Sequence, residues 1–252
     1  MARIQNPQEF EQKRQEIINA ALQLISEIGY DNLTIAHILK RLKISKGAFY
    51  HYYLSKEDLR SSIFGETNRL TDMLIGPLID DPNLTALQKL HGFYNTIVSW
   101  KNERKNIHLS QLRGFYRPEN DSFRSSMIAS WIAYFSDKMT RIIKQGIREK
   151  AFKVKFNNNL SEIVINLLLG QSEKIAAVML MALDAPEQET ASISTQFHEI
   201  VHDYNQALER VLGAKPGSIH LLDPQLLMGW FEFARQAESP AVARKEFVDA
   251  VS

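Results

Sequence analysis

The sequence of 252 residues contains no cysteine. Disulfide-stapled folds, cysteine-ligated zinc, iron–sulfur clusters and thiol catalysis are therefore excluded. Glycine and proline are scarce, with 11 and 8 residues, too few for a protein built from flexible linkers. Charge of one sign does not dominate either, because 30 Lys and Arg stand against 29 Asp and Glu. A uniformly basic chromatin-like protein and a highly charged disordered chain are both excluded.

Long hydrophobic runs are missing as well. The N-terminal stretch MARIQNPQEFEQKRQEI has no apolar segment of the signal-peptide type, and no uncharged apolar run of 18 residues follows. Hydrophobic residues nevertheless make up 44% of the chain, enough to build a core. We therefore expect a soluble, cytoplasmic protein with no membrane partner.

Apolar residues recur at every third or fourth position along most of the chain, which is the period of an α-helix. Residues typical of helix caps stand at Thr34, Ser45 and Ser55. Residues 151–157 alternate as a strand would, but a lone strand has nothing to pair with, so we expect a connection there. The expected helices cover Glu11–Ile28, three segments beginning at those caps, Leu84–Arg104, Ser122–Lys150, Leu160–Leu183, Ser192–Leu212 and a last segment from Asp223.

The charge is unevenly distributed along the chain. Asn32–Lys56 carries five Lys and Arg and no Asp or Glu, a charge of +5, so the remaining residues sum to −4. This basic stretch holds two short predicted helices and then the aromatic residues Phe49, Tyr50, Tyr52 and Tyr53. Such an arrangement is typical of a helix-turn-helix, whose second helix enters the major groove of DNA. Charge and spacing alone leave an alternative open, a solvated basic face on an ordinary helical hairpin.

The order of the residues adds a resemblance to a known family. Residues 17–25 read IINAALQLI, Gly29 and Tyr30 follow, and residues 34–57 read TIAHILKRLKISKGAFYHYYLSKE. This region resembles, over about 45 residues, the DNA-binding domain of the tetracycline-repressor (TetR) family of bacterial regulators. Its S-K-G-x-x-Y-x-x-[FY]-x-S-K-E core is a specific motif.

The resemblance implies which residues contact DNA. Residues 45–48 would stand at the entry of the recognition helix, where base edges are read. Thr34, Tyr50 and Lys56 would contact the phosphate backbone, and His51 would contact either a base edge or a phosphate. Phe49 and Tyr52 alternate with these positions, so we expect them in the core. The implied DNA-binding residues are Thr34, Ser45, Lys46, Gly47, Ala48, Tyr50, His51 and Lys56.

Two positions depart from the family pattern. Lys43 stands where the family usually has glycine in the turn, and Leu54 stands where it commonly has proline. If Lys43 is left-handed, it costs about 1 kcal/mol relative to glycine. Neither departure removes an expected DNA contact, and Lys43 adds a cation beside the predicted recognition helix.

A second motif competes with this interpretation. His198, Glu199 and His202 match the H-E-x-x-H zinc-protease signature, in which two histidines share one helix face and the glutamate is the general base. Asp203 follows directly, where that enzyme class prefers an uncharged residue, and the candidate third ligands, Glu209 and His220, have no recognisable motif around them. We therefore expect no catalytic residue, no metal and no cofactor, with a zinc-dependent hydrolase as the alternative.

The segment Leu160–Leu183 is apolar on nearly all sides, so it must be buried on more than one face. In the TetR family the last two long helices pair with their symmetry mates, which implies a homodimer here through about 160–183 and 192–212. A twofold dimer suits DNA because paired recognition helices reach half-sites about 34–36 Å apart. The alternative is a wholly intramolecular core.

Residues 84–150 combine aromatic side chains with a few polar ones, a mixture that suits a small-molecule pocket between helices. Any single aromatic residue in this region suits a plain core as well. The candidate ligand-binding residues are Trp100, Gln111, Tyr116, Trp131 and Tyr134.

Together these patterns predict an all-α protein. We expect a helix-turn-helix DNA-binding domain at 1–60, a larger ligand-binding and dimerising helical domain at 61–215, and a C-terminal helical extension at 216–252. The expected function is that of a ligand-responsive homodimeric transcriptional regulator, a repressor rather than an activator and not an enzyme. Its expected partners are a palindromic double-stranded DNA operator and a small-molecule effector. A ligand-binding module that has lost DNA binding is a further alternative.

Overall fold

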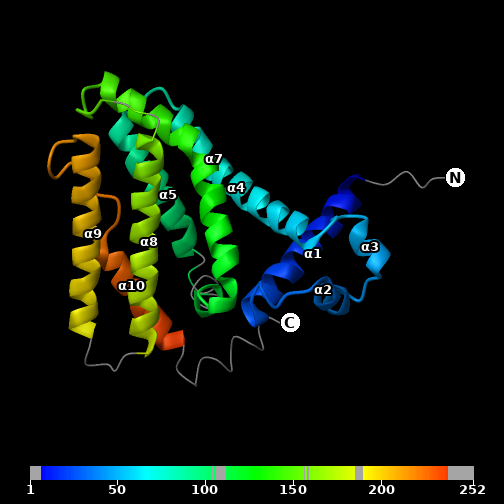
Figure 1. The fold of residues 1–252 in the computed structure, drawn as a ribbon. Helices are drawn as coiled ribbons and strands as arrows, with labels where there is room; N and C mark the ends of the chain where they lie inside the picture. Colours follow the sequence, from blue (N-terminus) through cyan, green and yellow to red (C-terminus); the bar gives the residue numbers. More distant parts are fainter. Residues whose placement is uncertain are drawn as a thin grey trace. The chain divides into compact units, whose positions relative to one another are not determined.

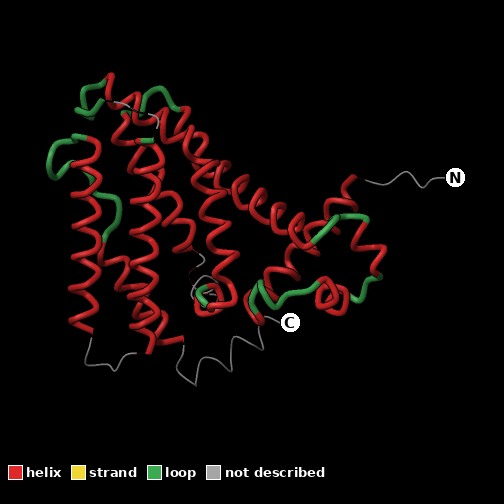
Figure 2. Tube along the Cα trace, in the orientation of Figure 1, coloured by secondary structure: helices red, strands yellow, loops and turns green. Residues whose placement is uncertain are grey.

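The computed structural model describes residues 7–103, 105, 112–155, 157, 159–184 and 190–237. Helices joined by turns make up this part of the chain, and it contains no strand (Figure 2). The prediction of an all-α fold is therefore confirmed, and so is the connection expected near 151–157. Gln111 and the predicted extension beyond residue 237 lie outside the described residues.

The predicted helices are present, with ends that differ by a few residues (Figure 1). The first begins earlier than expected, at Pro7, because proline suits the first turn of a helix. The helices are α1 Pro7–Ile28, α2 Ile35–Leu42, α3 Lys46–Tyr50, α4 Lys56–Asp80, α5 Ala86–Glu103, the 3₁₀ helix η1 Pro118–Asn120, α7 Asp121–Arg148, α8 Leu160–Asp184, α9 Thr190–Leu212 and α10 Pro224–Ala237.

The chain forms two compact units. The first unit comprises 1–71 and 111–131, and the second comprises 72–110 and 132–252. The chain leaves the first unit within α4, returns to it after residue 110, and leaves it again within α7. Residues 61–71 and 112–131, which the sequence led us to assign to the ligand-binding domain, thus pack with the DNA-binding helices. The predicted functional division at residue 60 stays a prediction.

The core of the first unit gathers the inner faces of α1, α2 and α3 with the first turns of α4 and α7. Tyr53, Phe49 and Phe123 are its largest fully buried side chains, and Phe123 of α7 lies against the rings of Tyr30 and Phe64. The prediction that Phe49 belongs to the core is confirmed. Tyr52 is half-buried and packs against the same core and the ring of Phe10.

The second unit is built around α8, which lies along α9, with α10 packed against both (Figure 1). Phe93 of α5 meets Phe135 of α7 edge to face, with ring centroids 5.7 Å apart. The buried carboxylate of Glu209 accepts the backbone N–H groups of Ser218 and Ile219 at 2.8 and 3.0 Å. These bonds fasten the loop that leads from α9 to α10.

Candidate nucleic-acid interface

The helix α2 begins at a complete capping box. Thr34 is the N-cap, its hydroxyl accepts the His37 N–H at 3.4 Å, and the His37 ring nitrogen accepts the Thr34 N–H at 3.3 Å. Each of these bonds satisfies a backbone donor that a helix start leaves unpaired. Both residues are exposed. The Thr34 hydroxyl, which also lies 3.2 Å from the His37 ring nitrogen, is thus exposed at the helix start, where a phosphate contact is expected of it.

The helix α3 presents its N-terminus to solvent. Ser45 caps it, accepting the Ala48 N–H at 3.1 Å, and Lys46 and Gly47 are exposed. A methyl group added at Gly47 would meet only the Ser45 hydroxyl, 4.0 Å away, so no internal packing requires glycine at this position. A small residue there does, however, let a DNA backbone or base edge approach closely.

Buried rings on the opposite side of α3 hold the helix in place. Phe49 and Tyr53 are 0% and 1% exposed, and the Tyr53 hydroxyl donates to the Arg14 carbonyl at 3.1 Å. Tyr50, on the outer side, is 41% exposed, and the Lys46 ammonium stands 5.8 Å from the centre of its ring. His51, the C-cap, is exposed as well. The helix thus offers polar and cationic side chains outward from a rigid base.

The turn between α2 and α3 is made by Lys43 in the left-handed conformation, with φ 54° and ψ 41°. Its N–H closes the end of α2 by donating to the Leu39 carbonyl. The strained geometry anticipated for a non-glycine residue at this position is confirmed.

Substituting Lys43→Gly should raise the free energy of unfolding by about 0.5–1 kcal/mol, because glycine adopts the left-handed conformation without steric cost. If the Lys43 ammonium contacts a DNA phosphate, the same change should also weaken DNA binding. The salt dependence of the binding constant should then fall by about one phosphate contact. Urea unfolding and salt-titrated DNA binding measure the two effects. Lys43→Asn is the matched control, since it tolerates the turn and also removes the charge. A Lys43→Gly protein less stable than wild type would contradict the assigned strain.

Lys56, the first residue of α4, lies on Tyr30. Its ammonium donates to the Tyr30 carbonyl at 2.6 Å and stands 4.1 Å from the centre of the Tyr30 ring. Partial burial lowers the pKa of Lys56. If Lys56 contacts the DNA backbone as expected, its ammonium would bind a phosphate and Tyr30 at the same time. The sequence did not predict this contact with Tyr30.

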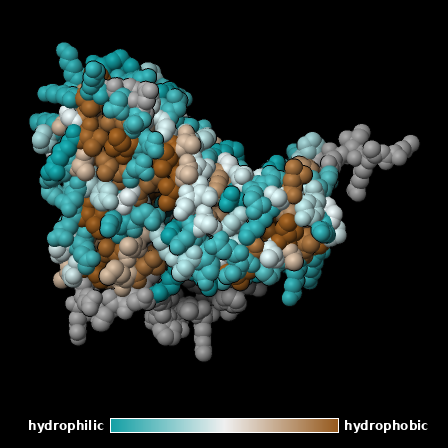
Figure 3. All heavy atoms as spheres, in the orientation of Figure 1, coloured by the Kyte–Doolittle hydropathy of each residue, from teal (hydrophilic) through white to brown (hydrophobic). Residues whose placement is uncertain are grey.

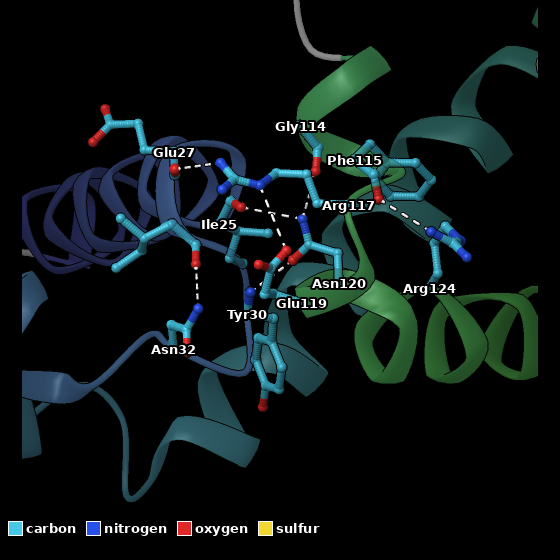
Figure 4. Close-up of polar contacts among 11 residues, drawn as sticks. Ile25, Glu27, Tyr30, Asn32, Gly114, Phe115, Arg117, Glu119, Asn120 and Arg124 are labelled. Atoms are coloured by element: carbon cyan, nitrogen blue, oxygen red, sulfur yellow. Dashed lines mark hydrogen bonds and ion pairs between the residues drawn. The ribbon is translucent and has the colours of Figure 1, made fainter. Parts of the chain in front are cut away.

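The end of α1 is bracketed by the segment that leads into α7 (Figure 4). Asn120 is 0% exposed, and its side-chain oxygen accepts the Tyr30 N–H at 2.6 Å. Its amide nitrogen donates to the carbonyls of Ile25 and Gly114 at 3.2 and 2.7 Å. Arg117 adds a bond to the Glu27 carbonyl at 2.7 Å. We call residues 114–122 the bracket.

The bracket fits closely against the turn that follows α1. The Asp31 N–H donates to the Glu119 carbonyl at 3.0 Å, and the Ser122 hydroxyl donates to the Asp31 carboxylate at 2.6 Å. Gly29 has φ +82°, and a side chain there would collide with Glu119. This turn leads directly into α2, so residues 114–122 fix the start of the helix-turn-helix.

The candidate ligand residues are divided between the two units. Trp131 packs against the core of the first unit, and Arg124 stands over the ring of Tyr116, 4.8 Å from its centre, in the same unit. Trp100 and Tyr134 belong to the second unit, where the Lys138 ammonium lies 4.0 Å from the centre of the Tyr134 ring. The structure does not bring these residues together in one described cavity, and their ligand role stays a prediction.

The H-E-x-x-H motif lies on the exposed side of α9. His198 bonds the Ser194 carbonyl at 2.8 Å, and His202 bonds the Gln206 side chain at 2.7 Å, so both rings are engaged by their own helix. Glu209 is occupied by the loop that follows α9. In the described part of the chain, no three metal-ligating side chains come together. The zinc-hydrolase alternative is not favoured.

Comparison with known proteins agrees with this geometry. Residues 17–63 match the family described as bacterial regulatory proteins, tetR family. The HTH-type transcriptional regulator BetI of Escherichia coli K12 is 22% identical over 173 residues, 68% of this chain and 78% of the relative. A tetR-family regulator from Pectobacterium atrosepticum has the same fold, with a TM-score of 0.50, 16% identity and coverage of 82% of this chain and 98% of that one.

The capped helix pair, the exposed start of α3 and the buried rings behind it define a helix-turn-helix transcriptional regulator. More particularly, residues 17–63 match the tetR family of bacterial regulators, and this part of the chain is similar to the DNA-binding domain of that family. Members of this family are dimeric, ligand-responsive DNA-binding proteins that act as repressors.

Proposed function

We propose that this chain represses transcription as a homodimer that binds a palindromic operator through α3, in the bacterial cytoplasm, and acts by binding rather than by catalysis. The observation that carries the proposal is the exposed start of α3, where Ser45, Lys46 and Gly47 face outward above the buried Phe49. A small residue, Gly47, next to a hydroxyl and a cation suits close approach to DNA. Thr34, Ala48, Tyr50, His51 and Lys56 complete the proposed contact surface.

Lys46→Ala and Tyr50→Phe should each weaken operator binding without unfolding the protein, because both side chains point to solvent. We expect a loss of about 1–2 kcal/mol for each variant, and a reduced salt slope only for Lys46→Ala. The operator is first recovered by selection of bound genomic fragments, and binding is then titrated at several salt concentrations. Lys215→Ala removes an exposed lysine of the loop after α9 and is the matched control. Unchanged binding in both α3 variants would overturn the proposed recognition helix and favour a module without DNA binding.

We also propose that α8 and α9, the predicted segments 160–183 and 192–212, form the dimer interface. Residues 160–182 of α8 are long and apolar enough to cross a membrane by length and composition, yet only 33% of their most apolar window is buried within one chain. Ile163 and Met181 are 43% and 68% exposed, and Figure 3 shows hydrophobic residues gathered over this helix. A second copy of α8 and α9 would cover this apolar surface.

Met181→Asp should convert the dimer to a monomer, because it places a charge in the proposed apolar interface. Size-exclusion chromatography with light scattering measures the mass directly. Met73→Asp introduces the same charge at another exposed methionine, 63% exposed on α4, and should leave the dimer intact. A Met181→Asp protein that remains dimeric would contradict this interface.

The second unit also offers a candidate effector site around α8. Gln171 is 0% exposed, and neither its amide oxygen nor its amide nitrogen has a partner in the described structure. The hydroxyl of the next residue, Ser172, donates to the Leu168 carbonyl at 3.2 Å and lies near the hydroxyl of the buried Tyr94 from α5. Burial raises the pKa of Tyr94 to about 12, so its hydroxyl stays neutral. These groups suit an uncharged effector with a hydrogen-bond donor and acceptor.

Effector binding would then act on DNA binding as a shift between two conformations. A ligand that binds one conformation of the dimer more tightly shifts the equilibrium toward that conformation. The shift can be no larger than the difference between the ligand's binding free energies for the two conformations. We propose that residues 114–122 carry the shift to the helix-turn-helix, because Asn120 bonds the backbone on both sides of the end of α1. The helix-turn-helix and these residues belong to one compact unit.

A further inference from the structure

The loop of residues 213–223, between α9 and α10, is fastened to α9 by two side chains. The Glu209 carboxylate accepts two of its N–H groups, and the Asn205 side-chain oxygen accepts the Leu221 N–H at 3.4 Å. Glu209 and Asn205 stand four residues apart, so they share one face of α9. Burial would raise the pKa of Glu209, but the N–H groups that it accepts outweigh burial and lower it. The attachment to α9 therefore persists in mild acid.

A third side chain, from another helix, fastens the same loop to α5. The Nε2 atom of His91 accepts the His220 N–H at 3.3 Å. A ring nitrogen accepts a hydrogen bond only while it carries no proton, so the neutral His91 ring has its proton on Nδ1. Protonation of Nε2 would place one N–H group against another, and the bond would become a contact between two donors. The attachment to α5 thus depends on a neutral His91.

The surroundings of His91 favour the neutral ring. The side chain is half-buried, and burial lowers its pKa. The neighbouring His220 ring lowers the pKa of His91 further, while the Ser218 carbonyl acts in the opposite direction. His91 is therefore neutral near pH 7 and takes up a proton only when the solution becomes acidic.

No carboxylate in the described part of the chain offsets a charge on His91. Glu209 acts on His220 instead. A protonated His91 would therefore gain no ion pair in place of the lost hydrogen bond. The other charged side chains of the loop and of the neighbouring segments of α4, α5 and α9 are bound to other groups or exposed to solvent; they are Asp80, Lys89, Arg210, Lys215 and Asp223.

We infer that His91 is a pH-sensitive latch of the second unit. The neutral ring fastens the loop of residues 213–223 to α5, and protonation in mild acid releases the loop from α5 while Glu209 still holds it to α9. Ile219 and Leu221 of this loop are 1% and 0% exposed, so their side chains are part of the core. Release of the latch therefore loosens the core where the loop leads into α10. This device is independent of the contacts proposed for DNA.

The test compares the full-length wild type with His91→Gln by thermal unfolding at about pH 7.5 and pH 5.5, on either side of the ordinary histidine pKa. Glutamine can accept the His220 N–H with its side-chain oxygen and does not titrate. Because the pKa of His91 is lower in the folded than in the unfolded protein, its stabilising effect is complete above about pH 6.5 and is lost as the pH falls through the folded-state pKa. The Tm of wild type should therefore fall by about 2–4 °C more than that of His91→Gln between the two pH values. His198→Gln, which removes an exposed histidine of α9, should keep the wild-type pH dependence.

Hydrogen exchange at the same two pH values observes the latch directly. In wild type, protection of the loop of residues 213–223 should fall about tenfold at the lower pH, after correction for the intrinsic exchange rate, while α8 stays protected. The same loop in His91→Gln should change little. Wild-type exchange decides the question even if His91→Gln folds poorly.

Three outcomes would overturn the inference. The first is an equal pH dependence of Tm in wild type and His91→Gln. The second is a wild-type loop that stays protected in acid. The third is a loss of protection in α8 together with the loop, which would show general acid unfolding in place of a latch.

Discussion

Replacing Asn120 with alanine should destabilise the first unit by about 2–3 kcal/mol and weaken operator binding with it. The side chain is completely buried and bonds three backbone groups. The carbonyls of Ile25 and Gly114 each keep a second backbone donor. The Tyr30 N–H has no other acceptor in the described structure, so the alanine variant leaves it buried and unpaired. Thermal and urea unfolding measure the loss.

The effect on DNA binding follows from the position of Tyr30. Its carbonyl and ring hold Lys56 at the start of α4, and its backbone leads into α2. Ser122→Ala is the matched control, because it removes an exposed bond to Asp31 from the same segment and should change stability by less than about 0.5 kcal/mol. If the Asn120 variant keeps wild-type stability and operator affinity, the bracket does not position the helix-turn-helix.

The helix-turn-helix could be predicted because its determinants are local. Thr34 and Ser45 cap helices through donors three residues away, and the turn conformation of Lys43 follows from its place between two helices. Phe49 alternates with exposed positions, which is enough to assign it to the core. These relations span less than two turns of helix and can be read from spacing alone.

The bracket and the effector site could not be predicted in the same way. Asn120 bonds Tyr30 across 90 positions, and an asparagine before a helix is ordinarily read as a cap rather than as a buried clamp. Aromatic residues alone do not distinguish a ligand site from a core. Trp131, one of the candidate ligand residues, packs against the core of the first unit. One signal was present and unused. Gln171 is an amide in the middle of a largely apolar helix, where a polar side chain that faces the core needs a partner.

Gln171→Met should raise the free energy of unfolding by about 1–3 kcal/mol, an unusual direction for a change in a core. Methionine is unbranched and similar in length, so it can fill the same space while removing two unpaired polar atoms. For a protein of this size such a gain corresponds to a rise in Tm of about 2–12 °C. Asn95→Met, an exposed position on α5, is the control and should leave Tm nearly unchanged.

The same variant tests the function of the buried amide. Small uncharged amides and hydroxylated compounds are screened on wild type for stabilisation and for release of the operator. Compounds that bind beside Gln171 should lose both effects in Gln171→Met while the variant still binds the operator. A variant that is less stable than wild type would show that the amide already has partners, such as ordered water. A stabilised variant with an unchanged response would place the effector elsewhere. Greater stability together with a lost response would mean that the unpaired amide serves to bind the ligand and lowers the stability of the ligand-free protein.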